Sequence, residues 1–459
     1  MTGITYYVDP QDGDDTHSGT APSEALKTSA CRQFLPGDTV LFKRGCEIRG
    51  MLHTCDGLDK RPITYGAYGA GGKPVFLGSM TASLPADWVE EKPSVWRFTG
   101  AFPSEVCNLV FNGGEMCGNL RWQIDDLKKQ GEWHYTLIGK TTGKSQCETS
   151  GDGGILYIFS DGNPGSCYSS IECSLWGNRK LAGGSHDIVI ENLVFRNSGV
   201  HGFHAVGAEN ITLRQCEFHC IGGAVWNRER RIRFGNAIEF WEGGRNLLVE
   251  KCVFKDIYDS GVTHQGGPPA VVPEQIFFTG NLFINCGMAA YECREPAAKE
   301  VYFERNTCIN AGGGFSMQGE APPRQSEIHP QPMGHHVFIW RIVKNSQKGH
   351  VYIRNNIFHE APCGAAIYSI VDPADEQQFV IDSNCYWQTT GRVLVHINGK
   401  DYAPTEFKLY QSETGKDHGS MLADPLFLDP EKGNFRLQEK SPCPGWGIIF
   451  QFPSELNSK

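Results

Sequence analysis

Two acidic side chains and an indole lie close together in one short stretch, GNAIEFWEGG (235–244). The apolar residues Ile238 and Phe240 alternate with Glu239 and Trp241, which predicts a strand with the glutamate and the tryptophan on one face. A carboxyl group can donate or accept a proton, and an indole can stack on the apolar face of a sugar ring. The stretch therefore suggests carbohydrate chemistry, provided that other reactive side chains stack beside it.

Seven segments share one pattern, in which apolar and polar residues alternate up to a final residue that is usually aromatic. They are DIVIENLVF, NITLRQCEF, NLLVEKCVF, QIFFTGNLF, EVYFERNTC, HVYIRNNIF and QFVIDSNCY, which end at Phe195, Phe218, Phe254, Phe283, Cys308, Phe358 and Tyr386. Alternation with period two predicts strands, and the shorter intervals between the final residues, 23 to 29 positions, define one repeating unit. No interval holds a convincing amphipathic helix, so the repeat predicts a parallel β-helix.

One column of the repeat, two residues before the final position, is rich in asparagine. It reads Leu193, Cys216, Cys252, Asn281, Asn306, Asn356 and Asn384. Asparagine tolerates the left-handed backbone conformation of tight turns, and its amide can bond the equivalent amide one coil away. We therefore expect an internal asparagine ladder, capped by thiols, at a corner of the coils.

With these features the chain resembles the right-handed parallel β-helix proteins of the carbohydrate-active kind, the pectate-lyase-like superfamily. Three further stretches carry the resemblance: TYYVDPQDGDDTHSGT with LPGDTVLFKRG and PITYGAYGAGGKPVF, then FGNAIEF with IYDSGVTHQG, and finally MLADPLFLDPEKGNFRLQEKSPCPGWG. The resemblance implies an all-β fold, and the handedness rests on it and on the general rule for parallel crossovers. Its members include polysaccharide lyases, glycoside hydrolases, epimerases and esterases, so the fold leaves the reaction open.

A second short strand follows each ladder strand, and its apolar residues align in two inward columns. The outward positions between them form two neighbouring stripes: His204, Glu239, Thr263, Glu292, Ser316 and Tyr368, then Val206, Trp241, Gln265, Arg294, Gln318 and Ile370. Glu239 and Glu292 fall two rungs apart, which puts their backbones about 10 Å from each other. Leaning side chains would then reach the separation of about 6.5–9.5 Å that leaves room for a water in an inverting glycosidase.

These positions predict a glycoside hydrolase that works with two carboxylates. One of Glu239 and Glu292, its pKa raised by burial and a nearby negative charge, would protonate the glycosidic oxygen. The other would deprotonate water or attack the anomeric carbon. Asp259, at the turn before the intervening strand, is a third catalytic candidate that could instead bond turn amides.

The neighbouring polar and aromatic side chains are candidates for binding the carbohydrate substrate. They are Trp241, His204, Gln265, Arg294, Gln318, His201 and Arg231. Arg231 belongs to a loop with four arginines, AVWNRERRIRF (224–234), which could recognise an acidic sugar or simply be solvated around Glu229. The plain alternative for Glu239 and Glu292 is that they are solvated charges.

A polysaccharide lyase or epimerase acting on uronates is the first rival, and a non-catalytic glycan-binding solenoid is the second. The resemblance implies that a lyase would use a basic residue as proton abstractor, a role that Arg294 could fill, and would add Ca²⁺ at an acidic cluster. The aligned strands hold no such cluster, and DPQDGDD near the start lacks the full calcium-loop pattern. We therefore expect hydrolysis without a cofactor or a metal.

The amino-acid composition argues against several classes of binding partner. A net charge of −10 argues against binding to nucleic acid or to anionic membranes, and no run of 18 apolar residues exists. The first residues lack the pattern of a secretory signal, and the 17 cysteines show no CxxC pair. We expect reduced thiols and a cytoplasmic protein; the alternative is a secreted one whose signal has been removed. Nothing indicates the oligomeric state.

The repeats define one continuous domain with two regions. Residues 1–180 are expected to hold the cap, irregular β structure and the first coils, and residues 181–459 the main coils and a C-terminal cap. An insertion between Gln318 and His350 leaves the face that carries the two glutamates. It either builds a wall of a binding groove or conceals an additional coil, since its interval of 50 is close to twice 25.

Overall fold

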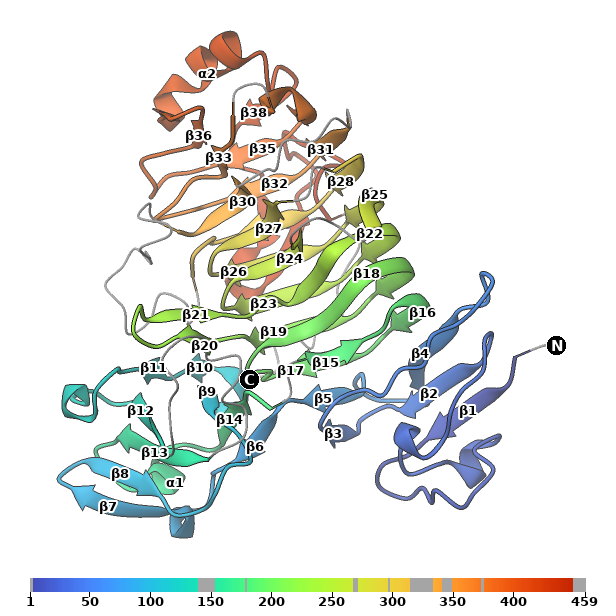
Figure 1. Ribbon diagram of the computed structural model, residues 1–459. Helices are drawn as coiled ribbons and strands as arrows, with labels where there is room; N and C mark the ends of the chain where they lie inside the picture. Colours follow the sequence, from blue (N-terminus) through green and yellow to red (C-terminus); the bar gives the residue numbers. More distant parts are fainter. Residues whose placement is uncertain are drawn as a thin grey trace.

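Parallel strands stack coil upon coil along most of the chain, as the period-two repeats predict (Figure 1). The computed structural model describes residues 3–138, 153–177, 180–266, 271–295, 298–313, 333–340, 349–372 and 375–448. Each central coil contributes strands to two long parallel sheets. The chain forms a parallel β-helix, so the predicted fold class is confirmed.

The larger sheet has 17 strands. They are β1 (Thr5–Val8), β2 (Thr39–Lys43), β4 (Ile63–Tyr68), β15 (Lys180–Gly183), β16 (His186–Glu191), β18 (His201–Arg214), β22 (Ile238–Glu250), β24 (Ser260–Gln265), β25 (Val271–Thr279), β27 (Ala289–Arg294), β28 (Glu300–Glu304), β30 (His335–Trp340), β31 (His350–Arg354), β33 (Ile367–Ile370), β34 (Phe379–Asp382), β36 (Val395–Ile397) and β37 (Lys400–Tyr402).

The second sheet has 10 strands and closes the other side of the coils. They are β3 (Glu47–Arg49), β5 (Val75–Leu77), β17 (Val194–Arg196), β19 (Glu217–Ile221), β23 (Val253–Ile257), β26 (Leu282–Cys286), β29 (Thr307–Ile309), β32 (Ile357–His359), β35 (Cys385–Trp387) and β38 (Met421–Leu422).

An antiparallel lobe is inserted between β5 and β15 and lies beside the first coils (Figure 1, lower left). Its strands are β6 (Ser79–Thr81), β7 (Trp88–Lys92), β8 (Val95–Phe98), β9 (Val106–Phe111), β10 (Met116–Cys117), β11 (Asn119–Leu120), β12 (Glu132–Leu137), β13 (Gly154–Phe159) and β14 (Ile171–Leu175), with the short helix α1 (Pro164–Cys167). The lobe packs around its own apolar cluster, which includes Trp133 and Phe111. The coils continue across the insertion, because β5 pairs directly with β17.

Smaller elements complete the chain. A hairpin of β20 (Ala224–Asn227) and β21 (Ile232–Phe234) leads into β22. Helix α2 (Phe407–Thr414) lies at the far end of the coils, and β39 (Phe427–Asp429) pairs with β40 (Asn434–Leu437) (Figure 1).

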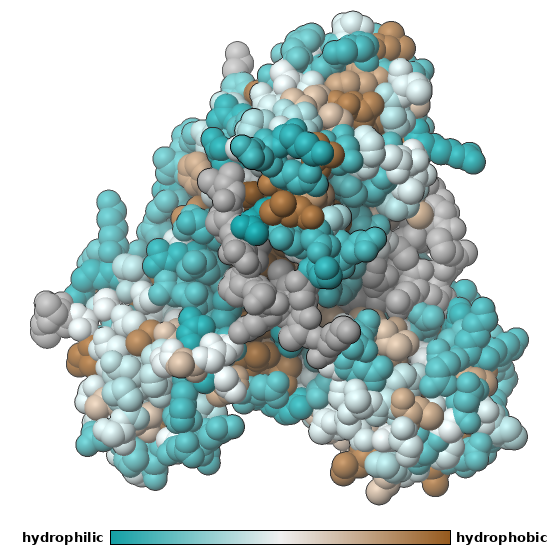
Figure 2. Space-filling model, turned by 180° about the vertical axis from the view of Figure 1, so that it is seen from behind, coloured by the Kyte–Doolittle hydropathy of each residue, from teal (hydrophilic) through white to brown (hydrophobic). Residues whose placement is uncertain are grey.

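No helix in these ranges is long and apolar enough to cross a membrane. From behind, the surface is mainly hydrophilic, with small separate hydrophobic patches (Figure 2).

Aromatic side chains fill the core where the repeat predicted them. The rings of Phe195 and Phe218 stack with centroids 5.2 Å apart, and the stack continues to Phe254 at 5.3 Å and Phe283 at 4.7 Å. All four side chains are buried. Removing each from water stabilises the fold by roughly 1.5–3 kcal/mol.

The asparagine ladder is present. Asn281 Nδ2 donates to Asn306 Oδ1 at 3.1 Å, Asn306 Nδ2 to Asn356 Oδ1 at 3.2 Å, and Asn356 Nδ2 to Asn384 Oδ1 at 3.0 Å. Its backbone differs from the expectation: the left-handed residue is the one before the ladder position, for example Asn355 with φ of 59°. The ladder side chain thus bonds inside the coil, while its neighbour makes the turn.

Asn306, one of the two inner asparagines of the ladder, should be important for stability. Asn306→Ala would leave the main-chain N–H of Asn281 and the carbonyl of Phe278 without their buried partners. We expect a loss of about 3 kcal/mol in the free energy of unfolding, measured by urea denaturation. Asn246→Ala is the control, because its bond to Asn210 is exposed; its left-handed φ of 54° should limit the cost to about 1 kcal/mol. Equal losses would contradict the role of the ladder.

Candidate active site

One row of side chains crosses four neighbouring strands in register. His204 of β18 pairs with Glu239 of β22, which pairs with Thr263 of β24, which pairs with Glu292 of β27. The prediction that the two glutamates share one stripe two coils apart is confirmed. At the usual strand spacing their backbones lie about 10 Å apart.

Neither glutamate is a solvated charge. Glu239 is 4% exposed and Glu292 is 1% exposed, although both point away from the coil interior. The plain alternative, in which the two glutamates are solvated charges, is therefore wrong. A buried carboxylate is tolerated only where donors replace the lost water, so the partners of each glutamate decide its chemistry.

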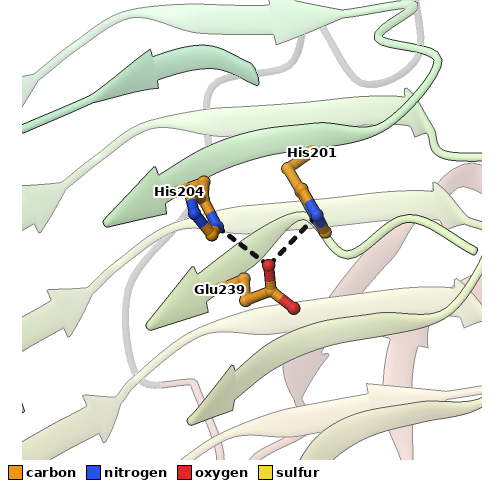
Figure 3. Close-up of side chains that lie close together, drawn as sticks. All are labelled: His201, His204 and Glu239. Atoms are coloured by element: carbon orange, nitrogen blue, oxygen red, sulfur yellow. Dashed lines mark hydrogen bonds and ion pairs between the residues drawn. The ribbon is translucent and has the colours of Figure 1, made fainter. Parts of the chain in front are cut away.

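Four side-chain nitrogen atoms surround the carboxylate of Glu239, and three of them donate hydrogen bonds to it. His201 Nε2 lies 3.0 Å and His204 Nδ1 2.8 Å from its Oε2 atom, and Figure 3 shows both imidazoles converging on this oxygen. Asn236 Nδ2 donates to Oε1 at 3.2 Å, and Gln265 Nε2 donates to the same oxygen. Burial alone would raise the pKa of Glu239, but the two histidines and the bond from Gln265 outweigh it and lower the pKa to about 2. Glu239 is therefore an anion throughout the physiological range.

The hydrogen-bond partner of His201 determines its tautomer. The main-chain N–H of Asn236 donates to His201 Nδ1 at 3.2 Å, so Nδ1 carries no proton and Nε2 is the N–H group that faces Glu239. Burial lowers the pKa of His201, which favours this neutral form. His204 Nδ1 in turn donates to the anionic Glu239.

The same three residues form the one group among the described residues that could hold a metal ion. Their ligand atoms, from His201, His204 and Glu239, lie within 4.8 Å of one another. A metal on His201 Nε2 would require the proton on Nδ1, which faces the N–H of Asn236 instead. With this hydrogen bond in place the Nε2 lone pair of His201 is not available to a metal, although two histidines and a glutamate are donor types found in zinc sites.

Glu292 has a different environment. Trp340 Nε1 donates to its Oε1 atom at 2.8 Å, and Ser260 Oγ donates to Oε2 at 3.2 Å. Burial raises the pKa of Glu292 to about 6, assisted by the charges of Asp259 and Glu239 and opposed by Arg294 and the Trp340 bond. Glu292 thus retains a proton over part of the neutral range and can give it to a ligand.

Asp259 supports the start of the strands that carry the site. Its Oδ2 atom accepts the main-chain N–H of Gly235 at 2.9 Å, and Asn236 Oδ1 accepts the N–H of Ser260 at 3.0 Å. Of the two interpretations weighed for Asp259, the structure shows bonding to a backbone amide, although that amide belongs to the neighbouring coil. Its charge still contributes to the raised pKa of Glu292.

The predicted binding residues divide into those near the cluster and those away from it. Gln265 is buried on Glu239, whereas Trp241 is half-buried, with its indole against the backbone of Gly266. Half-buried Arg294 lies over the Trp340 ring, 4.9 Å from its centroid. Gln318 lies outside the described residues.

The loop with four arginines does not gather at the site. Arg231 is exposed in the turn between β20 and β21 and has a φ of 54°. Arg228 pairs with Glu105 of the lobe, not with Glu229, and Arg233 lies over the ring of Tyr258. These two arginines attach the lobe to the coils, so the structure gives no support to an acidic-sugar role for this loop.

The strand beyond Glu292 is not the one expected. The sequence alignment put 314–318 on the next rung, but β27 pairs with β30, and Phe338 lies beside Glu292 and Trp340 beside Arg294. The insertion therefore conceals a coil, which was one of its two interpretations. Trp340, a partner of Glu292, was missed for this reason; the alternation in HHVFIW was the available signal.

Two oxygen atoms on β24, the strand between those of Glu239 and Glu292, lack partners among the described residues. Thr263 Oγ1 and Gln265 Oε1 are buried on β24 without a hydrogen bond. Buried polar atoms are rarely left without partners, so these two atoms favour a ligand or water with hydroxyl groups between Glu239 and Glu292.

Comparison with known proteins agrees on the fold. Residues 173–330 match the family model described as a right handed beta helix region. No curated protein sequence is similar enough to count as a match. The match and the stacked coils show that the chain is a right-handed parallel β-helix.

Several solved structures have a similar course of the chain. The GH136 lacto-N-biosidase of Eubacterium ramulus is 14% identical, with a TM-score of 0.46, over 92% of this chain and 67% of that one. A pectate lyase is 13% identical, with a TM-score of 0.48, over 96% and 91%. A surface adhesin of Streptococcus pneumoniae is 12% identical, with a TM-score of 0.36, over 78% and 74%. At such low identity, none of them indicates the reaction of this chain.

Because the pKa of Glu292 is raised, replacing it should increase the relative stability of the protein as the pH rises. Because its folded pKa of about 6 exceeds the ordinary 4.5, the stability it contributes is present below pH 4.5 and lost as pH rises through 6. Glu292→Gln removes this loss. The free energy of unfolding of the variant, relative to that of the unmodified protein, should therefore be about 2 kcal/mol higher at pH 7.5 than at pH 4. Urea denaturation at both pH values measures the change; a constant difference would contradict the buried acid.

Proposed function

We propose that this right-handed parallel β-helix is a carbohydrate-active enzyme, and more narrowly a glycoside hydrolase in which Glu292 donates the proton. One observation carries the proposal: two buried carboxyl groups of one stripe have pKa values displaced in opposite directions, to about 2 for Glu239 and about 6 for Glu292. Such a pair keeps one group ionised and the other protonated at the same pH, which is the division of roles in glycoside hydrolysis.

The surroundings of Glu292 suit a general acid. Its bonds from Trp340 and Ser260 hold the carboxyl group in one orientation, and burial favours the neutral form. The proton passes to the glycosidic oxygen as the bond to the anomeric carbon breaks. The permanent negative charge of Glu239, two coils away, stabilises the positive charge that develops on the sugar ring.

The remaining side chains fit a neutral, hydroxyl-rich ligand. The half-buried indole of Trp241 offers an apolar face. Thr263 Oγ1 and Gln265 Oε1, on the strand between those of the two glutamates, have no hydrogen bond to any residue that the structure describes and would accept hydroxyl groups. Arg231 and Arg228, which would have favoured an acidic sugar, are turned to solvent or bound to Glu105.

A lyase or epimerase acting on uronates is the second candidate, because one observation favours it. His204 rests on Glu239, and Lys180 Nζ lies 3.4 Å from the His204 carbonyl, so a base and a cation are neighbours. Ca²⁺ takes six to eight oxygen ligands, and the one metal-like cluster of the described residues offers a single carboxylate. In the part of the chain that the structure describes, this cluster does not offer the oxygen ligands that the calcium ion of a lyase would need.

Turnover of defined glycans tests the proposal. We expect reducing ends to appear without the ultraviolet absorbance of a new double bond. Absorbance would instead identify the lyase, and binding without turnover the glycan-binding solenoid. Glu292→Gln should lower kcat by about 10²- to 10⁴-fold, with a smaller loss on aryl glycosides whose leaving group needs no proton. Glu250→Gln, on the same strand as Glu239 but outside the stripe, is the control and should keep full activity.

The pH profile provides a separate test of the acid. Activity should fall as pH rises above about 6, since only protonated Glu292 can donate. The bond from Trp340 lowers the pKa of Glu292, so Trp340→Phe should move this alkaline limb to higher pH. The profile of kcat/KM measures the shift. An unmoved limb, or a limb shifted downward, would exclude Glu292 as the acid.

A further inference from the structure

We propose that Asn236 is a positioning residue of this site, because its side chain connects Glu239 to the residue that holds the carboxyl group of Glu292. The inference rests on the proposed hydrolase function and adds to it a residue that acts through other side chains. Asn236 lies two residues before β22 and is 4% exposed. It belongs to the same short stretch as Glu239, but the strand pattern of that stretch does not single it out.

Asn236 is part of a polar row that runs beside the row of the glutamates. The register that pairs β18 with β22 and β22 with β24 places His201, Asn236 and Ser260 side by side on three neighbouring coils. All three residues are buried. Buried polar groups need hydrogen-bond partners, and Asn236 finds them on its own coil and on both neighbouring coils.

The side chain of Asn236 bridges two groups of the site. Its Nδ2 atom donates to Glu239 Oε1 at 3.2 Å, and its Oδ1 atom accepts the main-chain N–H of Ser260 at 3.0 Å. Ser260 Oγ in turn donates to Glu292 Oε2 at 3.2 Å. Glu239 and Glu292 are therefore joined through two intervening residues, and a displacement of Asn236 would reach both carboxyl groups.

The neighbours of Asn236 determine which way its amide group points. The lowered pKa of Glu239 keeps it an anion, which only accepts hydrogen bonds, and the main-chain N–H of Ser260 only donates. With the amide reversed, its oxygen would face the carboxylate and its NH₂ group would face the N–H, so both bonds would be lost. Asn236 thus has one favourable orientation, which holds Glu239 Oε1 in place.

A purely structural role at this position would not require asparagine. Asp259, on the next coil, accepts the main-chain N–H of Gly235 at 2.9 Å, so an aspartate can satisfy a backbone amide in this region. At position 236 an aspartate would keep the acceptor for Ser260 but would place a second negative charge against Glu239. The donor end of the amide is what the site needs from Asn236.

Fixed carboxyl groups matter for the proposed reaction. Misplacing a reacting group by about 1 Å can lower the rate by about 10²-fold. Asn236 holds Glu239 directly, and it holds Glu292 through Ser260. Because it acts on this geometry through other side chains, its loss should lower kcat and leave KM nearly unchanged.

Asn236→Asp and Asn236→Ala test the positioning role. Both should lower kcat by about 10- to 100-fold with little change in KM, and aspartate should be no better than alanine because it repels Glu239. If Asn236 served only the backbone of Ser260, aspartate would restore full activity. Asn227→Asp is the matched control: its Oδ1 accepts the main-chain N–H of Arg230 in an exposed bond of the hairpin, and it should keep full activity.

A double-mutant cycle tests the connection to Glu292. Ser260→Ala removes the hydroxyl group that donates to Glu292 and keeps the main-chain N–H that donates to Asn236. We expect Ser260→Ala to lower kcat by about 10-fold in the unmodified protein and by less than about 3-fold in Asn236→Ala, where the bridge is already broken. Equal losses in the two backgrounds would overturn the connection.

The remaining outcomes separate this inference from the proposed function. Full kcat in Asn236→Asp, with hydrolysis still lost in Glu292→Gln, would overturn the positioning role and leave the hydrolase. No turnover of any glycan by the unmodified protein would overturn both. Urea denaturation shows whether the variants fold; if neither variant of Asn236 does, Ser260→Ala decides, and an unchanged kcat in that variant would overturn the inference.

Discussion

Hydrogen bonding between successive coils is the constraint on which the rest of the structure depends. Each central strand is paired on both sides, so a residue's position along its strand determines its neighbours on the next coil. The site follows from this register alone: His204, Glu239, Thr263 and Glu292 are separated widely in sequence but lie in one row. The buried asparagine bonds fix the same register inside the coils.

The same stacking buries the carboxyl groups of the site, which lowers the stability of the fold. Coils of pure hydrocarbon would be more stable than a row with two buried carboxyl groups, since each must be compensated by donors. The groups around Glu239 outweigh its burial and lower its pKa to about 2. Glu292 is only partly compensated, and the deficit appears as a raised pKa. The raised pKa thus appears where the fold loses stability, as strongly perturbed groups in active sites often do.

The coils and the shared stripe of the two glutamates could be predicted from the sequence. Alternation and the spacing of the final aromatic residues indicated the coils, and the alignment of apolar residues put Glu239 and Glu292 in one stripe. Burial of the stripe was not predictable, because the pattern of one strand says nothing about what covers its outer side. The partner of Arg228 also escaped prediction: Glu105 belongs to a distant lobe, and charge pairs leave no periodic signal.

The position of β30 shows a second limit. An interval of 50 residues can be one long insertion or two coils, and only the pairing of Glu292 with Phe338 decides between them. His201 is a third case, since its contribution depends on a backbone N–H from Asn236 and not on residue type. Sequence reasoning put Glu239 and Glu292 in one row but did not predict their hydrogen-bond partners.

The insertion of the lobe has a consequence for how such a chain can change. β5 and β17 pair as adjacent strands although the lobe separates them in sequence, so the chain leaves the stack and rejoins it at a single seam. The lobe also holds the hairpin that precedes β22, through Arg228 and through Arg233 bound to the carbonyl of Cys107. A different module spliced at this seam would alter the border of the candidate site while the row from His204 to Glu292 kept its register.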